Sequence, residues 1–487
     1  MLTYQDLLLN ENNKESFILS AISNYKSSDM YYWAVEGENY SRQKNTAITK
    51  YRKMIRNLAG KLQPDLISAN HKMCSNFFKR FITQENQFLL GNGILFEEDH
   101  SDKLGKNFDS QMQRAGYEAL KAAVSYVFYN LDHIEVFPSL QFVPLFDEED
   151  GALKAGIRFW QIDISKPLRA TLYELDGYTE YIFNSRDKKK EGYFEILRPK
   201  TPYKIRLYET SITTIYEGMN YPSFPIVPLW GNEDHQSELV GLKEEIDCYD
   251  LIFSGFANDL DDVSQIYWIL ENSGGMDDVD LAQFIQRLRN LHIAEMNGDS
   301  GQKLTPYTID IPHEARNGYL DRLEHQLYND AMALNTAEIT NGNVTATAIQ
   351  ASYEPLNNKT DAYEYCIRDC INGILSLAEI DDEPTFKRSM MANQQEMTQM
   401  ILSAANYLDT ETILKKLPFI DDSEVDTILS KLETEESERF EEIPLEEATA
   451  PLMTKELNIS KPLPDETISG AVETNLPETG MFSRNVR

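Results

Sequence analysis

The sequence has no apolar run approaching 18 residues, the length that predicts a membrane-spanning helix. It begins MLTYQDLLLNENNKES, without a basic segment followed by an apolar one, so we expect no secretion signal. Four cysteines, Cys74, Cys248, Cys366 and Cys370, are scattered over 487 residues, too few for a disulfide framework. These absences predict no transmembrane helix and no disulfide framework, and they favour synthesis in a reducing compartment.

Known catalytic motifs are also missing. The sequence has no G-x-x-x-x-G-K-[ST], G-x-G-x-x-G, G-x-S-x-G or H-E-x-x-H pattern, so it predicts no cofactor and no enzyme of these classes. Cys366 and Cys370 share a helix face but lack further ligands at zinc spacing, which favours packed thiols. Asp259, Asp261 and Asp262 lack the glycine-kinked loop of a calcium site. We predict no metal site, and a metal-dependent hydrolase using these aspartates is kept as an alternative.

Positive charge is scarce relative to negative charge. The formal net charge is −33, with 79 acidic and 46 basic residues, so the surface repels a polyphosphate at long range. This argues against a protein that grips DNA, although a protein that lets DNA slide past a wall is compatible with it. The hydrophobic fraction of 41% is ample for packed cores.

Hydrophobic periodicity predicts a mixed architecture in the first half of the chain. We expect helices over 1–60, ending in a basic helical run KYRKMIRNLAGK, and an amphipathic helix over 110–130. Residues 134–228 change to short alternating runs separated by turn residues, which predict a mostly antiparallel β region carried on helices. The expected fold class is α+β with several domains.

A heptad pattern of apolar residues, hereafter the seam, follows this β region and predicts a long helix over 237–263. The seam residues predicted to pack between subunits are Leu239, Leu242, Ile246, Tyr249, Phe253, Phe256 and Leu260. Such a seam needs a partner, and copies of the same chain around a symmetry axis would supply one. The alternative is packing within one chain against a second helix over 313–334.

Between these helices, QIYWILENSGG, DLAQFIQRLRNLHIAEM and KLTPYTIDIP predict a small βαβ-like module. After them comes the stretch LNTAEITNGNVTATAIQASYE, residues 334–354, which has two acidic side chains, Glu338 and Glu354, and no basic one. We call it the uncharged stretch, because residues 339–353 carry no charge. A helix over 345–377, kinked at Pro355, and a helical unit over 381–440 with Asp409 as an N-cap complete the pattern. The proline-rich end of the chain predicts an extended tail.

The order of these segments resembles the portal proteins of tailed bacteriophages, of the long-tailed type with wing, stem, clip and crown. LISANHKMCSNFFKRFITQENQFLLGNGILFE is similar to the family's wing segment, and LDTETILKKLPFIDDSEVDTIL to its crown. FPIVPLWGNEDHQSELVGLKEEIDCYDLIFSGFANDLDDVSQIYWIL carries the most matches. These are Pro225, Pro228, Asn232, Ser237, Leu239, Ile246, Asp247, Tyr249, Ser254, Asn258 and Asp262. The sequence departs from the family at Asp409, where Ser is usual, and at Thr345 and Ala346, where Ser-Gly is usual.

The resemblance implies a multidomain portal fold. Its parts would be a wing over 1–235, stem helices over 236–263 and 312–334 around a clip over 264–311, a tunnel loop and kinked wing helix over 335–380, a crown over 381–449 and a tail over 450–487. The implied tunnel-loop residues are Thr336, Glu338, Thr340, Asn341, Gly342, Asn343 and Thr345. The implied clip residues facing other proteins are Asp277, Asp278, Gln286, Arg287, Arg289 and Asn290.

The same resemblance implies the partners. It predicts that the chain forms a ring, which has twelve subunits in the family. The ring would be assembled in the host cytoplasm and would lie at one vertex of the virion capsid. Double-stranded DNA would pass through the channel without sequence specificity. The terminase large subunit, a head–tail adaptor, the capsid and the scaffolding protein would contact the ring, and no membrane would. A head–tail adaptor that does not gate DNA is the second alternative.

Overall fold

The computed structural model describes residues 2–56, 60–65, 69–184, 192–209, 214–263, 267–271, 303–307, 312–337 and 346–389, and 398, 401–417, 420, 425, 427–432 and 434 near the C-terminus. The chain divides into two compact units, Met1–Asn393 and Gln394–Arg487, which are described separately. In the described parts of the chain, no helix is both long and apolar enough to cross a membrane.

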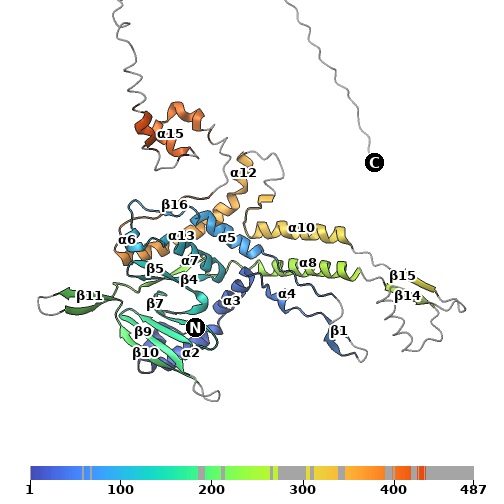
Figure 1. Cartoon of the computed structure of the whole chain (residues 1–487), viewed down its shortest axis with the longest axis horizontal. Helices are drawn as coiled ribbons and strands as arrows, with labels where there is room; N and C mark the ends of the chain where they lie inside the picture. Colours follow the sequence, from blue (N-terminus) through green and yellow to red (C-terminus); the bar gives the residue numbers. More distant parts are fainter. Residues whose placement is uncertain are drawn as a thin grey trace, which may run out of the picture. The chain divides into compact units, whose positions relative to one another are not determined.

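Helices and antiparallel sheets alternate in the first unit (Figure 1). The helices of its N-terminal half are α1 (Tyr4–Leu9), α2 (Lys14–Lys26), α3 (Asp29–Ser41), α4 (Thr46–Lys50), α5 (Phe77–Leu90), α6 (Ser101–Leu104) and α7 (Phe108–Ala122). Those of its C-terminal half are α8 (Lys243–Val263), α10 (His313–Asp330), α12 (Ala346–Ser352) and α13 (Glu354–Ala378).

The β region is antiparallel throughout its described pairs, as predicted. A five-stranded meander has the order β10-β9-β8-β7-β6, and a three-stranded sheet has the order β13-β4-β5. The meander strands are β6 (Phe142–Phe146), β7 (Leu153–Trp160), β8 (Arg169–Glu174), β9 (Gly177–Asn184) and β10 (Tyr193–Thr201). The strands of the smaller sheet are β4 (Val124–Asn130), β5 (His133–Pro138) and β13 (Ile226–Trp230).

Four two-stranded pairs complete the described strands. They are β1 (Met54–Arg56) with β2 (Leu62–Pro64), β3 (Ile94–Leu95) with β16 (Thr385–Phe386), β11 (Lys204–Glu209) with β12 (Thr214–Met219), and β14 (Tyr267–Glu271) with β15 (Lys303–Tyr307). Residues 381–389, which the sequence grouped with the helical unit, fall within the first unit.

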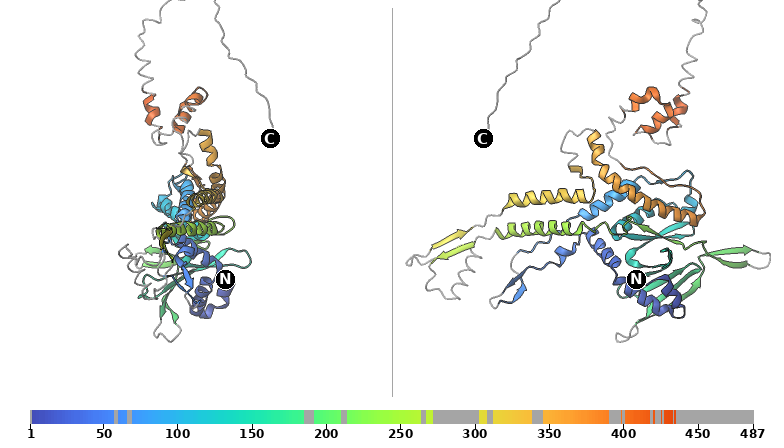
Figure 2. Two further views of the ribbon diagram at one scale, coloured as in Figure 1. Left: turned by 90° about the vertical axis from the view of Figure 1, so that its right-hand side faces the viewer. Right: turned by 180° about the vertical axis from the view of Figure 1, so that it is seen from behind.

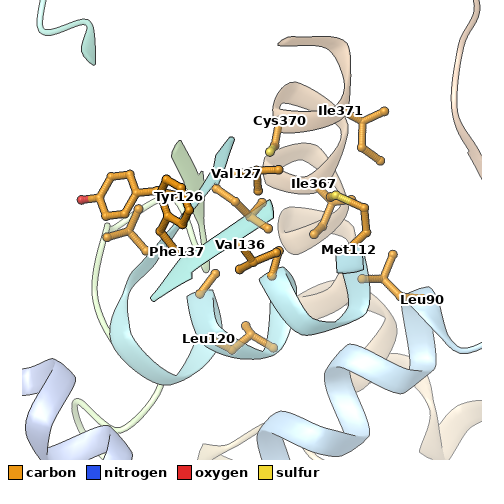
Figure 3. Packing of buried hydrophobic residues seen from close by; sticks show 14 of the residues in the cluster. Leu90, Met112, Leu120, Tyr126, Val127, Val136, Phe137, Ile367, Cys370 and Ile371 are labelled. Carbon is orange, nitrogen blue, oxygen red and sulfur yellow. The ribbon is translucent and has the colours of Figure 1, made fainter. Parts of the chain in front are cut away.

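The main core forms where α5, α7 and α13 pack against the three-stranded sheet. Figure 3 shows side chains from all these elements meeting: Leu90, Met112, Leu120, Val127, Val136, Ile367 and Ile371. A second core lies where α2 packs on the five-stranded sheet, with Phe17, Ile18 and Tyr25 against Leu145 and Ile157. Burying these side chains supplies the main driving force for this unit, because each is worth roughly 1.5–3 kcal/mol.

The helix expected over 110–130 is too long, because α7 ends at Ala122 and Val124–Asn130 is strand β4. Ala123 has φ 76°, a left-handed conformation that stops the helix, and its carbonyl accepts from the Gly231 N–H at 2.9 Å. Strand β4 is buried on both faces, so its continuous apolar run cannot be distinguished from a buried helix by periodicity.

Two further helix predictions are wrong. The basic run KYRKMIRNLAGK is not helical beyond Lys50, because Tyr51 is extended and Met54–Arg56 pairs as a strand with Leu62–Pro64. Pro355 does not kink one long helix; it lies in the first turn of α13, which follows the separate helix α12. Proline is tolerated in a first turn because the N–H that it lacks has no partner there.

The small module between α8 and α10 also differs from the prediction. Strands β14 and β15 were expected and are present, but they pair antiparallel, with Trp268 opposite Pro306 and Leu270 opposite Leu304. A βαβ unit has parallel strands, so that description is wrong for this pair. The predicted helix between them lies outside the described residues.

The second unit is described mainly over 401–417. Helix α15 (Thr410–Lys416) begins as predicted, because Thr412 N–H donates to Asp409 Oδ2 at 3.0 Å. Asp409 therefore caps the helix in place of the serine that is usual in the family.

Candidate functional site

Helices α8 and α10 form the centre of the candidate site. They lie side by side and run antiparallel, since α8 leads toward β14 and α10 follows β15 (Figures 1 and 2). Gln326 Nε2 donates to Glu245 Oε1 at 3.0 Å, and Arg316 Nη1 lies 2.5 Å from Asp259 Oδ2. The packing of segment 237–263 on segment 313–334 within one chain, one of the two predicted arrangements, is therefore confirmed.

The helix predicted over 237–263 begins later than expected, because Leu239 and Leu242 lie in turns before α8 starts at Lys243. The seam divides into a buried and an accessible half. Its first three residues are at most 6% exposed and belong to the main core of the same chain: Leu239, Leu242 and Ile246. Tyr249 and Phe256 are half-buried, whereas Phe253 is 37% exposed and Leu260 is 55% exposed. Only the later seam residues thus have surface available for another subunit.

Exposed apolar side chains lie on two sides of α8. Phe253 and Leu260 are seven residues apart and share one side, because a helix turns about 100° per residue. Leu251, 40% exposed, lies two residues before Phe253 and so faces roughly the opposite side. Helix α8 therefore exposes apolar side chains on two different sides, here called the Phe253 strip, formed by Phe253 and Leu260, and the Leu251 strip, where Leu251 is the exposed apolar residue.

A third side of α8 is covered by the segment that precedes α5. Asp250, Ser254 and Asn258 recur every four residues and accept hydrogen bonds from backbone N–H groups of Ser75, Met73 and His71. The donor–acceptor distances are 2.8, 2.9 and 2.5 Å, respectively. We call this arrangement the α8 ladder. Nothing in the sequence analysis anticipated it, although the polar i, i+4 spacing is visible there.

The uncharged stretch is anchored where it leaves α10. Leu334 N–H donates to Gln84 Oε1 at 3.0 Å, and Gln84 Nε2 donates to the Leu334 carbonyl at 3.1 Å. The Leu334 side chain packs with Phe88, Tyr353 and Leu356. Phe88 and Tyr353 stack with ring centroids 5.7 Å apart. Both ends of the stretch are therefore held on α5.

Of the predicted tunnel-loop residues, Thr336 is described and exposed. Glu338, Thr340, Asn341, Gly342, Asn343 and Thr345 lie outside the described residues. The predicted clip residues Asp277, Asp278, Gln286, Arg287, Arg289 and Asn290 also lie outside them.

A buried ion cluster links the anchored loop to the start of α8. Lys359 Nζ lies 2.9 Å from Glu85 Oε2 and 2.6 Å from Glu238 Oε2, and it also donates to the Ala331 carbonyl at 3.3 Å. Burial raises the pKa of Glu85 to about 7, while the two neighbouring carboxylates outweigh desolvation and raise the pKa of Lys359. The cluster joins α5, α10 and α13 at one point.

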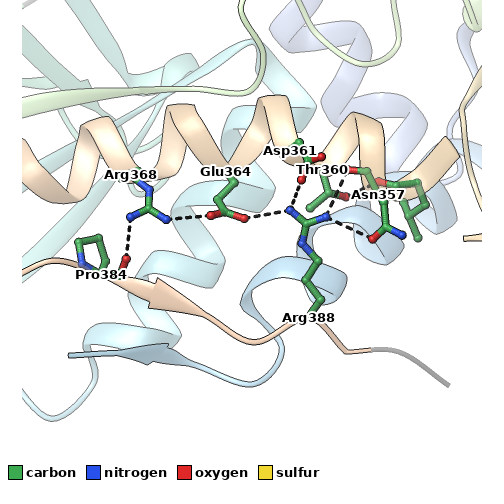
Figure 4. A network of polar contacts seen from close by, with 8 residues as sticks. Asn357, Thr360, Asp361, Glu364, Arg368, Pro384 and Arg388 are labelled. Atoms are coloured by element: carbon green, nitrogen blue, oxygen red, sulfur yellow. Dashed lines mark hydrogen bonds and ion pairs between the residues drawn. The ribbon is translucent and has the colours of Figure 1, made fainter. Parts of the chain in front are cut away.

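A second polar network holds the segment after α13 (Figure 4). Glu364 accepts from Arg368 at 2.9 Å and from Arg388 at 3.0 Å. Arg368 also donates to the Pro384 carbonyl at 3.0 Å, and Arg388 pairs with Asp361. Residues 384–388 are thereby fixed along α13, close to the base of the uncharged stretch.

The structure gives little support for metal chemistry at the aspartate cluster. Over the described residues, no three His, Cys, Asp or Glu side chains are placed to hold a metal ion. Asp259 is paired with Arg316, and Asp261 lies 3.4 Å from His71 Nε2. Burial raises the pKa of the Cys370 thiol and so disfavours the thiolate that a metal requires.

The comparison with known proteins decides the family. Residues 33–443 match the family described as "Phage portal protein, SPP1 Gp6-like". The chain belongs to this family. The main functional interpretation of the sequence, a phage portal protein, is thereby confirmed, and the residues that carried the resemblance can be placed in the portal chain.

Curated relatives share this assignment. The portal protein of Clostridium phage phiCD119 is 26% identical over 387 residues, which cover 74% of this chain and 84% of that protein. The portal protein of Bacillus phage SPP1 is 23% identical over 421 residues, which cover 80% of each chain. The solved structure titled "Neck of native GTA particle computed with C12 symmetry" aligns with a TM-score of 0.40 at 11% identity, covering 70% of this chain and 89% of that chain.

Several positions that carried the portal resemblance now have a physical role. Ser254 and Asn258 belong to the α8 ladder. Asp247 accepts from Lys243 Nζ at 2.7 Å and from the Tyr40 hydroxyl. The portal motif on α8 therefore fixes the helix against the segments before α5 and at the end of α3.

Proposed function

We propose that this portal chain assembles into a closed ring around a channel through which double-stranded DNA enters and leaves a capsid. The α8–α10 pairs would stand side by side as the stem of the ring. Twelve subunits at one capsid vertex of the virion are the expected arrangement. The part between β14 and β15 would face the terminase large subunit and later the head–tail adaptor, and the wing would face the capsid and scaffolding protein.

The two apolar strips of α8 carry this proposal. In a closed ring every subunit uses two different faces, one toward each neighbour, because the contact is head-to-tail around the axis. The Phe253 strip and the Leu251 strip lie on different sides of the helix, as such a contact requires. Covering both removes apolar surface from water, at about 25 cal/mol per Å².

The uncharged stretch supports the channel role. A lysine or arginine on a channel wall would pair with DNA phosphates and release counterions, which would slow a moving duplex. Residues 334–354 carry no basic side chain, and their ends are fixed by Gln84 and by the cluster around Phe88. We propose that this tunnel loop reaches the channel and contacts DNA weakly, through Thr and Asn side chains.

The loop is tested by adding positive charge to it. Asn343→Arg and Thr345→Arg should reduce the amount of DNA packaged by at least about tenfold, because each new cation adds a phosphate contact. Ile164→Arg is the matched control, since Ile164 is 96% exposed on the turn between β7 and β8. If the loop variants package as much DNA as this control, the loop does not contact DNA.

A further inference from the structure

One part of this acidic chain is strongly basic. Residues 39–64 contain seven lysine or arginine residues and no acidic residue, whereas the whole chain has a formal net charge of −33. The portal function proposed above does not use this stretch. A basic segment that only contacts water does not need a defined structure. A defined structure in this segment would therefore indicate that it forms a surface for another molecule.

The stretch forms a hairpin. After α4 ends at Lys50, β1 pairs antiparallel with β2, with Met54 opposite Pro64 and Arg56 opposite Leu62. Figure 1 shows it leaving α4 as a separate arm. We call residues 50–56 and 60–65 the basic hairpin. An isolated two-stranded hairpin is marginally stable in water, so this one gains stability from a surface to pack on.

The exposed side of the hairpin is both basic and apolar. Arg52, Met54 and Arg56 alternate along the strand and are all exposed, Met54 by 47%. On the facing strand Leu62 is 62% exposed. The partner surface should therefore be acidic with apolar side chains among its carboxylates.

The stem of the same protein has this chemistry. Helix α8 carries seven acidic residues and one basic residue. Exposed carboxylates lie at Glu244 on α8 and at Glu314 and Asp321, which are seven residues apart on one side of α10. Tyr319 is an exposed aromatic side chain on the same helix. A second copy of this chain would therefore provide the acidic surface that the hairpin requires.

Reach favours a second copy over the hairpin's own stem. One side of the chain's own α8 is already occupied by residues 71–75 through the α8 ladder. The six residues 51–56 reach about 20 Å if fully extended, whereas packed helices are about 8–10 Å apart. The hairpin is therefore long enough to pass its own helix pair and contact the next one.

We propose that the basic hairpin is an arm that docks on the acidic α8–α10 surface of a neighbouring copy of this chain. The inference rests on the proposed ring, since it requires adjacent stems. It assigns the contact a mixed character, with apolar packing of Met54 and Leu62 flanked by arginine–carboxylate pairs. Such pairs are screened by salt, so the arm makes ring assembly salt-sensitive.

The direct test places a photo-crosslinking amino acid at Met54 in the full-length chain. Irradiated rings of this variant should give a crosslinked dimer that joins position 54 of one chain to residues 243–261 or 312–330 of another. Mixing isotope-labelled and unlabelled chains identifies crosslinks between copies. Crosslinks confined to one chain, or to other regions of a second copy, would overturn the proposal.

A charge-reversal series separates this inference from the proposed function. Arg52→Glu with Arg56→Glu should lower the assembled fraction at limiting protein concentration by about tenfold and weaken its salt dependence. Lys166→Glu with Arg169→Glu is the control, with an equal charge change at exposed sites on another edge of the chain. Rings that assemble as well as the control overturn the hairpin contact and leave the portal function intact.

Two other outcomes are equally informative. If rings of the charge-reversed variant stay intact but no longer retain a 30-base-pair DNA duplex that wild-type rings retain, the hairpin is a nucleic-acid contact and the proposal is wrong. If the unaltered protein forms no ring at any concentration, the proposed function fails, and the hairpin contact fails with it.

Discussion

Ser254 on α8 is joined to Met73 by two hydrogen bonds. Met73 N–H donates to Ser254 Oγ at 2.9 Å, and Oγ donates to the Met73 carbonyl at 3.4 Å. Four helical residues rise about 6 Å and two extended residues span about 6.6 Å, so acceptors at 250, 254 and 258 match N–H groups at 75, 73 and 71. The Ser254 hydroxyl thereby provides hydrogen bonds for both the N–H and the carbonyl of Met73, which is not paired in a β-sheet.

Removing this hydroxyl should destabilise the first unit. Ser254→Ala leaves the Met73 N–H without its acceptor in a partly buried place, and we expect a loss of about 1–3 kcal/mol in the free energy of unfolding. Urea unfolding monitored by tryptophan fluorescence measures it. Ser27→Ala, on an exposed turn, should change the stability by less than about 0.5 kcal/mol. Equal effects of the two variants would show that the ladder contributes nothing.

Loss of the hydrogen bonds that anchor the uncharged stretch at Leu334 should make this part of the chain open more often. Gln84→Ala removes both hydrogen bonds to Leu334, so amide hydrogen exchange at Leu334 should accelerate by about tenfold or more. Gln87→Ala changes an exposed glutamine on the same helix and serves as the control. Unchanged exchange at Leu334 in the Gln84 variant would contradict the anchor.

The buried ion cluster predicts a pH dependence of stability. Burial raises the pKa of Glu85 from 4.5 to about 7, so the folded chain holds this proton when the unfolded chain has lost it. The free energy of unfolding that depends on Glu85 therefore decreases as pH rises from about 4.5 to about 7. Glu85→Gln cannot titrate, and its stability relative to the original chain should rise over this interval. A constant difference between the two proteins across these pH values would refute the assignment.

The Phe253 strip predicts an assembly defect without a folding defect. Phe253→Lys with Leu260→Lys places two charges on surface that is 37% and 55% exposed in the single chain, so the monomer should fold with nearly unchanged stability. In a ring the same charges would be buried without partners, and assembly should be lost. Ile162→Lys with Ile164→Lys, at 84% and 96% exposure, is the control for added charge. Size-exclusion chromatography with light scattering distinguishes the outcomes.

The sequence predicted the elements whose hydrophobic period is unambiguous. The two long helices, the antiparallel β region and the Asp409 cap are present, because each pattern has one stable solution in water. Strand β4 was misassigned because both its faces are buried and it has no period of two. The left-handed Ala123 that separates it from α7 carries no sequence signature, since alanine usually continues a helix.

The site was predictable only in part. The seam was recognised, but its period could not show that Leu239, Leu242 and Ile246 are buried by their own chain while Phe253 and Leu260 are accessible. That division depends on where α5 and α13 pack, which is a tertiary property. The α8 ladder had a visible signal, polar residues at 250, 254 and 258, yet their partners lie about 180 residues earlier in the chain.

The central claim is that identical helix pairs stand around an open hole. End-on electron micrographs of the purified full-length protein test it most directly. The account predicts closed rings with a central hole wide enough for a DNA duplex, formed without any added partner. Solitary particles at every protein and salt concentration, or closed discs without a hole, would contradict it.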